Sequence, residues 1–242
     1  MDVITAGFKV EAAAPAGCAG GQTRVHHRVV FDILPGEETP EGPIPEWRAR
    51  QVVSQTDVLR LLHFNMDRLA ARDPGYGRSL AALGMARGGV STVAAATSAL
   101  AALAQMEREG VSGLGVTAEA GGKLIATLSV SDLRGLVPER FGALALPVGA
   151  FLLLRPGSKT GFTWEDALLD RLPPAAAAGR WEEALAGAAL LVAVAPTATV
   201  REVVAVMVRE GKHRVYVCDE EGRAVGVVTP TDVLHLVVAD RG

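Results

Sequence analysis

The sequence has little cysteine and no long apolar run. Its two cysteines, Cys18 and Cys218, stand in unrelated contexts, and a fold of 242 residues would not depend on one such disulfide. No basic segment followed by an apolar block opens the chain, so we expect no signal peptide. The long uncharged stretch 184–200 contains Pro196 and is too short and too weakly apolar to span a membrane. We expect an intracellular protein of the cytoplasm and also of the nucleus, without a membrane partner.

The chain also lacks a strong excess of either charge. Its formal net charge is −3, which gives no electrostatic footprint for nucleic acid. His26 and His63 have no acidic or cysteine neighbours at ligand spacing, so we expect no metal site. No Ser/His/Asp or Cys/His pattern with a credible setting occurs, so we expect no catalytic residue and a binding protein rather than an enzyme. Half of the chain is apolar (49%), which predicts a folded core.

The last third of the chain shows the clearest periodicity. It reads as a strand at 190–194, a helix after Thr199, strands at 213–218 and 224–228, and a final helix opened by Thr229. Thr199 is a typical N-cap, and Gly211 ends the helix where a left-handed residue is favoured. The predicted order is strand, helix, strand, strand, helix.

The same order recurs upstream in one nearly full copy and one incomplete copy. The nearly full copy has a helix at 96–110, strands at 111–117 and 124–128, and a helix from Ser129 through Leu136. The incomplete copy has strands at 27–32 and 50–53, separated by an acidic, proline-rich loop. The predicted organisation is a partial repeat at 1–68, a linker at 69–89, a repeat at 90–136, a linker at 137–189 and a repeat at 190–242. The spacing of the copies is not constant, which favours modules joined by linkers over a solenoid.

Each copy contains a signature, [Ser/Thr]-x-[Ser/Thr]-Asp, at the start of its last helix. The three signatures are 54–57, 129–132 and 229–232. A carboxylate can accept hydrogen bonds from two vicinal sugar hydroxyls at once, and hydroxyl side chains at a helix start suit phosphate oxygens. Two copies also carry a His-Arg pair in the preceding strand, His27-Arg28 and His213-Arg214, and these cations suit phosphate. The pattern favours a nucleotide ligand.

The signature also has a purely structural interpretation. Ser or Thr followed three residues later by an acid is a helix cap with a favourable dipole placement. Capping needs only one hydroxyl, however, and gives no reason for the basic pair. The recurrence of the whole package therefore favours ligand binding.

These segments resemble a known family of regulatory proteins. HRVYVCDEEGRAVGVVTPTDVLHLVV is similar to the last CBS repeat of the gamma subunits of AMP-activated and sucrose-non-fermenting-type protein kinases, particularly the plant type. EGVSGLGVTAEAGGKLIATLSVSDLRGL resembles their third repeat, and HHRVVFDIL with RQVVSQTDVLRLL resembles the back half of their second. The resemblance implies an α/β fold of tandem CBS (β-α-β-β-α) repeats, packed as a CBS pair plus a partial third repeat.

The resemblance also implies a ligand and its site. AMP, ADP or ATP would bind in the cleft between repeats as a regulatory ligand, with no catalytic cofactor. The aspartates would hold ribose hydroxyls, the basic pairs would face phosphate, and the hydroxyl side chains would line the cleft. The implied binding residues are Asp232, Thr229, Thr231, His213, Arg214, Asp132, Ser129, Ser131, Asp57, Thr56, His27 and Arg28.

The resemblance implies protein partners as well, the alpha and beta subunits of the kinase. A gamma subunit has four repeats, and the first has no counterpart here, so we expect the chain to be incomplete at its N-terminus. In the middle copy, Ser112 stands in place of the histidine of the basic pair. Two alternatives remain open: a ligand-free CBS scaffold that bridges proteins, and a CBS sensor for another adenosyl ligand.

Overall fold

The fold is known from a computed structural model, in which the described residues run from 27 to 239. Internal segments outside the description are 35–37, 40–41, 44–45, 73, 88, 135, 155–171 and 189. Side chains are described from residue 53 to residue 236. Within this part of the chain, helices alternate with strands, and two three-stranded sheets are formed. The predicted α/β class is confirmed.

The middle repeat forms the first of these sheets. Its elements are β5 (Thr92–Ala94), α4 (Ala99–Glu109), β6 (Gly113–Thr117), β7 (Leu124–Ser129) and the 3-10 helix η2 (Val130–Leu133). Strand β6 lies in the centre, parallel to β5 and antiparallel to β7, and all its residues are buried. Helix α4 begins where the Ser98 hydroxyl accepts a hydrogen bond from the Ala101 amide at 3.2 Å.

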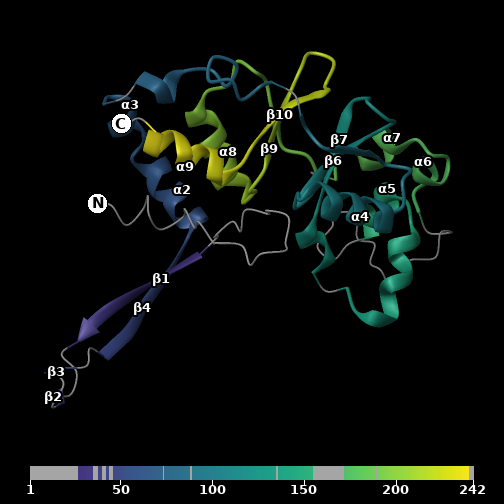
Figure 1. Ribbon diagram of the computed structural model, residues 1–242. Helices are drawn as coiled ribbons and strands as arrows, with labels where there is room; N and C mark the ends of the chain where they lie inside the picture. The colour runs from purple at the N-terminus through teal and green to yellow at the C-terminus, as the bar shows by residue number, and fades with distance from the viewer. Residues whose placement is uncertain are drawn as a thin grey trace.

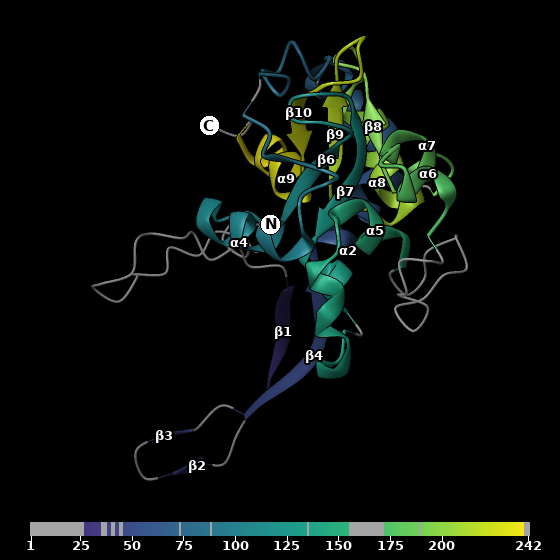
Figure 2. The same ribbon diagram turned by 90° about the vertical axis from the view of Figure 1, so that its right-hand side faces the viewer.

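The C-terminal repeat forms the second sheet in the same order. Its elements are β8 (Ala193–Val194), α8 (Val200–Glu210), β9 (Val215–Cys218), β10 (Ala224–Val228) and α9 (Pro230–Ala239). Strand β9 lies between parallel β8 and antiparallel β10. Helix α8 starts in a capping box between Thr199 and Glu202 and ends at Gly211, whose φ is 61°. The two sheets lie side by side (Figures 1 and 2).

The N-terminal repeat combines a long hairpin with two helices. Its elements are β1 (His27–Leu34), β2 (Glu38–Thr39), β3 (Gly42–Pro43), β4 (Glu46–Ser54), α2 (Gln55–Phe64), α3 (Met66–Ala70) and the 3-10 helix η1 (Pro74–Gly77). Strands β1 and β4 pair antiparallel and extend away from both sheets (Figure 1). Helix α2 instead packs against α8 and α9 of the C-terminal repeat.

The segment between the middle and C-terminal repeats contributes further helices. They are the 3-10 helix η3 (Pro138–Ala145), α5 (Val148–Leu154), α6 (Pro174–Ala177) and α7 (Trp181–Leu185). Every side chain of α5 is buried, and the Trp181 ring lies directly over Gly149. This segment is therefore part of the folded body.

Two hydrophobic cores hold the molecule together. The first joins the middle repeat to the segment after it, with Leu114, Val116 and Phe151 at 0% exposure. The second joins the N-terminal helix α2, through Val58 and Leu59, to α8, β9 and α9. Burying one such side chain stabilises a fold by about 1.5–3 kcal/mol. The N-terminal repeat is therefore anchored to the C-terminal repeat through α2.

Several sequence-based element predictions need correction. The helix expected from Ser129 through Leu136 is only the short η2. The strand expected at 190–194 is reduced to β8, and the loop expected at 35–46 contains β2 and β3. Leu100 of α4 is 59% exposed. Alanines Ala99 and Ala102 face the core instead, because α4 packs closely on its neighbours.

Candidate functional site

Two adjacent cavities open between the middle and C-terminal repeats. Cavity A has a volume of about 340 Å³, and cavity B has a volume of about 410 Å³. They share three residues, Ser112, Arg214 and Thr229, which stand between them. Cavity A is lined mainly by residues 129–134 of the middle repeat and by 211–214 and 229–231 of the C-terminal repeat. Cavity B is lined mainly by 89–91 and 110–113, together with Tyr216 of β9 and Val227 of β10.

The predicted binding residues divide between these places. Cavity A brings together Asp132, Ser129, Ser131, His213, Arg214, Thr229 and Thr231. Asp232 lines cavity B, so the two aspartates expected in one cleft lie in two neighbouring cavities. Asp57 lines neither cavity and is exposed. The side chains of His27 and Arg28 lie outside the described residues, although their backbone forms the start of β1.

All three signature aspartates also cap their own helices. The same carboxylate oxygen, Oδ2, accepts a hydrogen bond from the backbone amide of Ser54, Ser129 or Thr229, at 2.9, 2.7 and 2.7 Å. The hydroxyls of Ser54 and Thr229 donate to the same oxygen at 2.7 and 2.6 Å. Each signature therefore functions as a helix cap, as its structural interpretation states. Because the cap fixes each carboxylate at the start of its helix, it also presents Asp132 to cavity A and Asp232 to cavity B.

Arg214 stands at the boundary of the two cavities because β6 carries glycine opposite it. Its guanidinium donates a hydrogen bond to the Ser112 hydroxyl at 2.9 Å. A Cβ atom on Gly113 would lie 2.8 Å from Arg214 Cζ, inside contact distance. Gly115 similarly leaves room for Tyr216, whose ring would be 3.3 Å from a Cβ there. The two glycines of β6 thus leave room for the large side chains of Arg214 and Tyr216.

The tyrosine beside Arg214 is buried with an unpaired hydroxyl. Tyr216 is 1% exposed, and its hydroxyl has no hydrogen-bond partner among the described residues. The hydroxyl of Thr127 lies near it but outside hydrogen-bonding geometry. Burial raises the pKa of Tyr216 to about 12, although the charge of Arg214 opposes the rise. The phenol therefore stays protonated over the physiological range.

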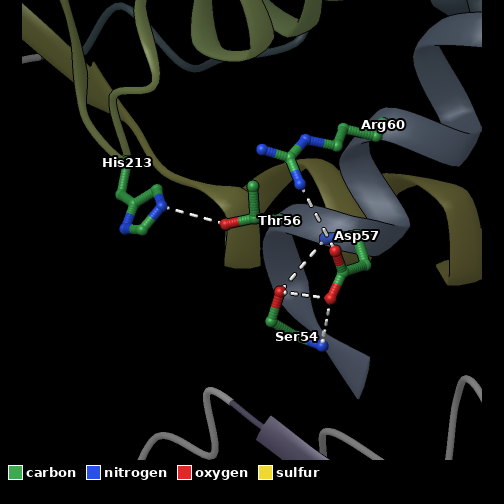
Figure 3. Close-up of polar contacts among 5 residues, drawn as sticks. All are labelled: Ser54, Thr56, Asp57, Arg60 and His213. Carbon is green, nitrogen blue, oxygen red and sulfur yellow. Dashed lines mark hydrogen bonds and ion pairs between the residues drawn. The ribbon is translucent and has the colours of Figure 1, made fainter. Parts of the chain in front are cut away.

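Helix α2 brings the N-terminal repeat to cavity A. The side chain of Gln55 lines the cavity, and its Nε2 donates to the Thr231 hydroxyl at 3.3 Å. The Thr56 hydroxyl lies 2.9 Å from Nε2 of His213 (Figure 3). In the same view the Asp57 carboxylate is turned toward Ser54 and Arg60, away from His213. Residues of three repeats therefore surround cavity A.

The two cavities differ in charge. Arg134, Lys212, Arg214 and the histidine His213 line cavity A, together with one carboxylate, Asp132. Helices α4 and α8 both end at a left-handed glycine, Gly110 and Gly211, so the residues that follow them are structural equivalents. In cavity B the equivalents of Lys212, His213 and Arg214 are Val111, Ser112 and Gly113. Cavity A therefore suits an anion that also carries hydroxyls, and cavity B suits a less charged ligand.

Sequence reasoning missed several residues that line cavity A, among them three with long polar side chains, Gln55, Arg134 and Lys212. Lys212 directly precedes the basic pair and continues its charge, so a wider search for cations would have found it. Arg134 and Gln55 lie beside or within a signature, but no pattern distinguishes them from surface residues. Only the placement of α2 and η2 brings these two side chains to the cavity.

Other functional features are not found in the part of the chain that the structure describes. No group of three or more His, Cys, Asp or Glu side chains is arranged to hold a metal ion there. None of the helices described is both long and apolar enough to cross a membrane.

Comparisons with known proteins agree with the repeat architecture. Residues 191–239 match the family model of the CBS domain. A crystal structure of a conserved protein from Pyrococcus horikoshii is 18% identical, with a TM-score of 0.50, and the match covers 88% of this chain and 69% of that one. None of the curated proteins is similar enough to this chain to count as a match. The fold is therefore one of tandem CBS repeats.

Two further solved structures are more distant. MJ1225 from Methanocaldococcus jannaschii, a proposed archaeal homologue of the gamma subunit of AMPK, is 16% identical with a TM-score of 0.49. That match covers 78% of this chain and 55% of the other, so the chain spans about half of that protein's length. CBSX2, solved in complex with AMP, is 16% identical with a TM-score of 0.44, and the match covers 68% of this chain and 99% of that one.

Proposed function

We propose that this protein is a regulatory protein that binds an adenine nucleotide, AMP, ADP or ATP, in cavity A, and that it is not an enzyme. The observation that carries the proposal is the composition of this cavity. It places one carboxylate, Asp132, together with a cluster of basic side chains, Lys212, His213 and Arg214. A nucleotide has the complementary pair of groups, a sugar diol and an anionic phosphate chain.

Each part of the ligand has a suitable partner in cavity A. The Asp132 carboxylate would accept hydrogen bonds from the ribose hydroxyls, and Arg214 would bind phosphate oxygens, with Lys212 and the Thr231 hydroxyl as further donors. Leu190 and Val192 provide the apolar surface for the base. In cavity B, Asp232 would hold a sugar in the same way, but with fewer cations for phosphate.

Four other predicted residues do not contribute a described side chain to cavity A. Thr56 contacts His213 and Asp57 caps α2, so neither lines cavity A in this structure. For His27 and Arg28, binding of phosphate stays a prediction.

The regulatory output would be a change in binding to a protein partner. We propose the alpha and beta subunits of an energy-sensing kinase as that partner, in the cytoplasm and the nucleus. AMP and ATP would compete for cavity A, and each would favour a different arrangement of the repeats. The difference between their affinities for the two arrangements is the coupling free energy that would change the activity of the kinase.

A thermal-shift series on the full chain tests the nucleotide assignment. AMP, ADP and ATP at saturating excess should each raise the melting temperature, because a ligand of the folded state alone stabilises it. S-adenosylmethionine serves as the comparison ligand. A shift with S-adenosylmethionine alone would favour a sensor for another adenosyl ligand, and no shift with any of the four would favour a ligand-free scaffold.

A reconstitution experiment tests the kinase assignment separately. The purified chain, mixed with recombinant alpha and beta subunits, should elute with them as one complex in size-exclusion chromatography. Binding of AMP without formation of this complex would keep the nucleotide sensor and reject the kinase partner.

A further inference from the structure

A hydroxyl from one repeat holds an imidazole of another. Thr56 lies in the first turn of α2, and its Oγ1 is 2.9 Å from Nε2 of His213 (Figure 3). His213 lies in the exposed connection between α8 and β9, which also carries Lys212 and Arg214. A side chain on such a connection has several accessible rotamers, and a hydrogen bond to a fixed partner selects among them.

The partner is fixed because α2 is anchored independently of this hydrogen bond. Val58, Leu59 and Leu62 of α2 are at most 8% exposed and belong to the core formed with α8 and β9. Gln55 is 7% exposed and donates to Thr231. The Thr56 hydroxyl therefore occupies a defined position beside cavity A without depending on His213.

We infer that Thr56 is a positioning residue that orients His213 for an anionic group in cavity A. The inference rests on the proposed function, because it assigns a role to the same cavity. The inference extends the proposed function by making the N-terminal repeat part of the ligand site, although Thr56 itself does not line the cavity. Ligand affinity then depends on the docking of α2, and by linkage the ligand stabilises that docking.

The chemistry of a hydroxyl suits this role. It donates to Nε2 when the proton of the neutral ring is on Nδ1, and it accepts from Nε2 when that nitrogen is protonated. It therefore holds the ring in either tautomer and as the imidazolium. Serine keeps this ability, whereas valine has the shape of threonine without the hydroxyl.

Calorimetric titration of the full chain with AMP tests the role. Thr56→Val should weaken AMP binding by about three- to tenfold, the range for one lost hydrogen bond, and Thr56→Ser should bind within about twofold of the wild type. Thr197→Val, at an exposed turn, is the matched control and should have no effect. Equal AMP affinity in Thr56→Val and the wild type would overturn the inference, as would equal losses with valine and serine, which indicate a packing role.

A double-mutant cycle asks whether Thr56 acts through His213. In a His213→Ala background, Thr56→Val should cause no further loss of AMP affinity. A full additional loss would overturn the inference. Circular dichroism melting of each variant checks the fold, and Thr56→Ala, which also lacks the hydroxyl, replaces the valine variant in the cycle if that variant does not fold.

A ligand-free measurement separates this inference from the proposed function. In two-dimensional NMR of the histidine rings without ligand, Thr56→Val should change the Nε2 signal of His213 and Thr56→Ser should preserve it. A wild-type chain that binds no AMP would reject the proposed function. An unchanged His213 signal in Thr56→Val would reject the positioning role, whatever the chain binds.

Discussion

The Arg214 guanidinium donates a 2.9 Å hydrogen bond to the Ser112 hydroxyl and so links the C-terminal repeat to the middle repeat. Both residues line cavity A and cavity B. In cavity B, Arg214 is the one cationic side chain among the described lining residues, whereas cavity A has others. The position of this guanidinium therefore affects both cavities, and cavity B depends on it for any anion.

Gly113→Ala should weaken AMP binding without removing any charge. The new Cβ would lie 2.8 Å from Cζ of Arg214 and 2.8 Å from the Leu128 carbonyl oxygen, so the guanidinium must move. We expect a loss of about tenfold or more, the lower range for a hydrogen bond from a charged group. Gly142→Ala is the control, because no atom lies within 4 Å of its Cβ position. Calorimetry that finds unchanged AMP affinity in a folded Gly113→Ala protein would contradict the placement of phosphate at Arg214.

Asp132→Asn and Asp232→Asn should have different effects on AMP. Asparagine keeps an oxygen that can accept the capping hydrogen bond but loses the charge, so the substitution isolates ligand recognition. Asp132 lines cavity A, and we expect Asp132→Asn to weaken AMP binding by about 1.5–3 kcal/mol, as for the loss of a charge-assisted hydrogen bond. Asp232 lines cavity B, and its variant should bind AMP within about twofold of the wild type. Calorimetric titrations with the reverse order of effects would move the nucleotide to cavity B.

Tyr216→Phe should stabilise the fold at neutral pH. The hydroxyl is buried without a hydrogen-bond partner among the described residues, and its removal should raise the free energy of unfolding by up to about 1 kcal/mol. Burial raises the pKa of Tyr216 from 10.0 to about 12, so the phenol ionises more readily in the unfolded chain than in the folded protein. The wild-type protein should therefore keep its full stability below pH 10 and lose stability as the pH rises toward 12. Tyr216→Phe should lack this alkaline loss. Urea unfolding at pH 7 and near pH 11 measures both effects.

Tyr76→Phe, at the other tyrosine of the chain, controls for the loss of a phenol in general. If Tyr216→Phe proved strongly destabilising at pH 7, its hydroxyl would have an essential hydrogen bond, through water or the Thr127 hydroxyl.

Thr199→Ala should lower the free energy of unfolding by about 1 kcal/mol. Its hydroxyl accepts a hydrogen bond from the Glu202 amide at 3.3 Å at the start of α8. Helix α8 provides Val200, Val203 and Val204 to the second core, so the loss should be seen in the unfolding of the whole chain. Thr199→Ser, which keeps the hydroxyl, should restore most of the stability. Denaturant unfolding in which serine is no better than alanine would indicate that the methyl group, rather than the cap, is important.

The sequence predicted the order of elements well where local signals are strong. Thr199 and Gly211 mark the two ends of α8, and both function as expected. The short strand β5 was missed because Thr92–Ala94 lies among alanines and is defined by its pairing with β6. The helix expected after Ser129 ends after one turn, although its start carries the same cap as α9. Pairing and packing decide such cases, and local propensity does not.

The candidate site shows the same limit. Sequence patterns identified Asp132, His213 and Arg214, which line cavity A. They could not separate Asp132 from Asp232, because both sit in identical local surroundings and only the tertiary arrangement assigns them to different cavities. The role of Gly113 was equally hidden, because a glycine in a strand gives no indication of the arginine that lies over it.

The signature aspartate starts a helix whether or not it also faces a cavity, and this has a consequence for how such genes change over time. Asp57 begins α2 as Asp132 and Asp232 begin their helices, yet it lies outside both cavities. A repeat that stops recognising a metabolite would still lose stability on replacing this residue, so purifying selection retains the acid regardless of occupancy. A census of the motif across genomes therefore counts helix starts, and it overstates the number of working sensors.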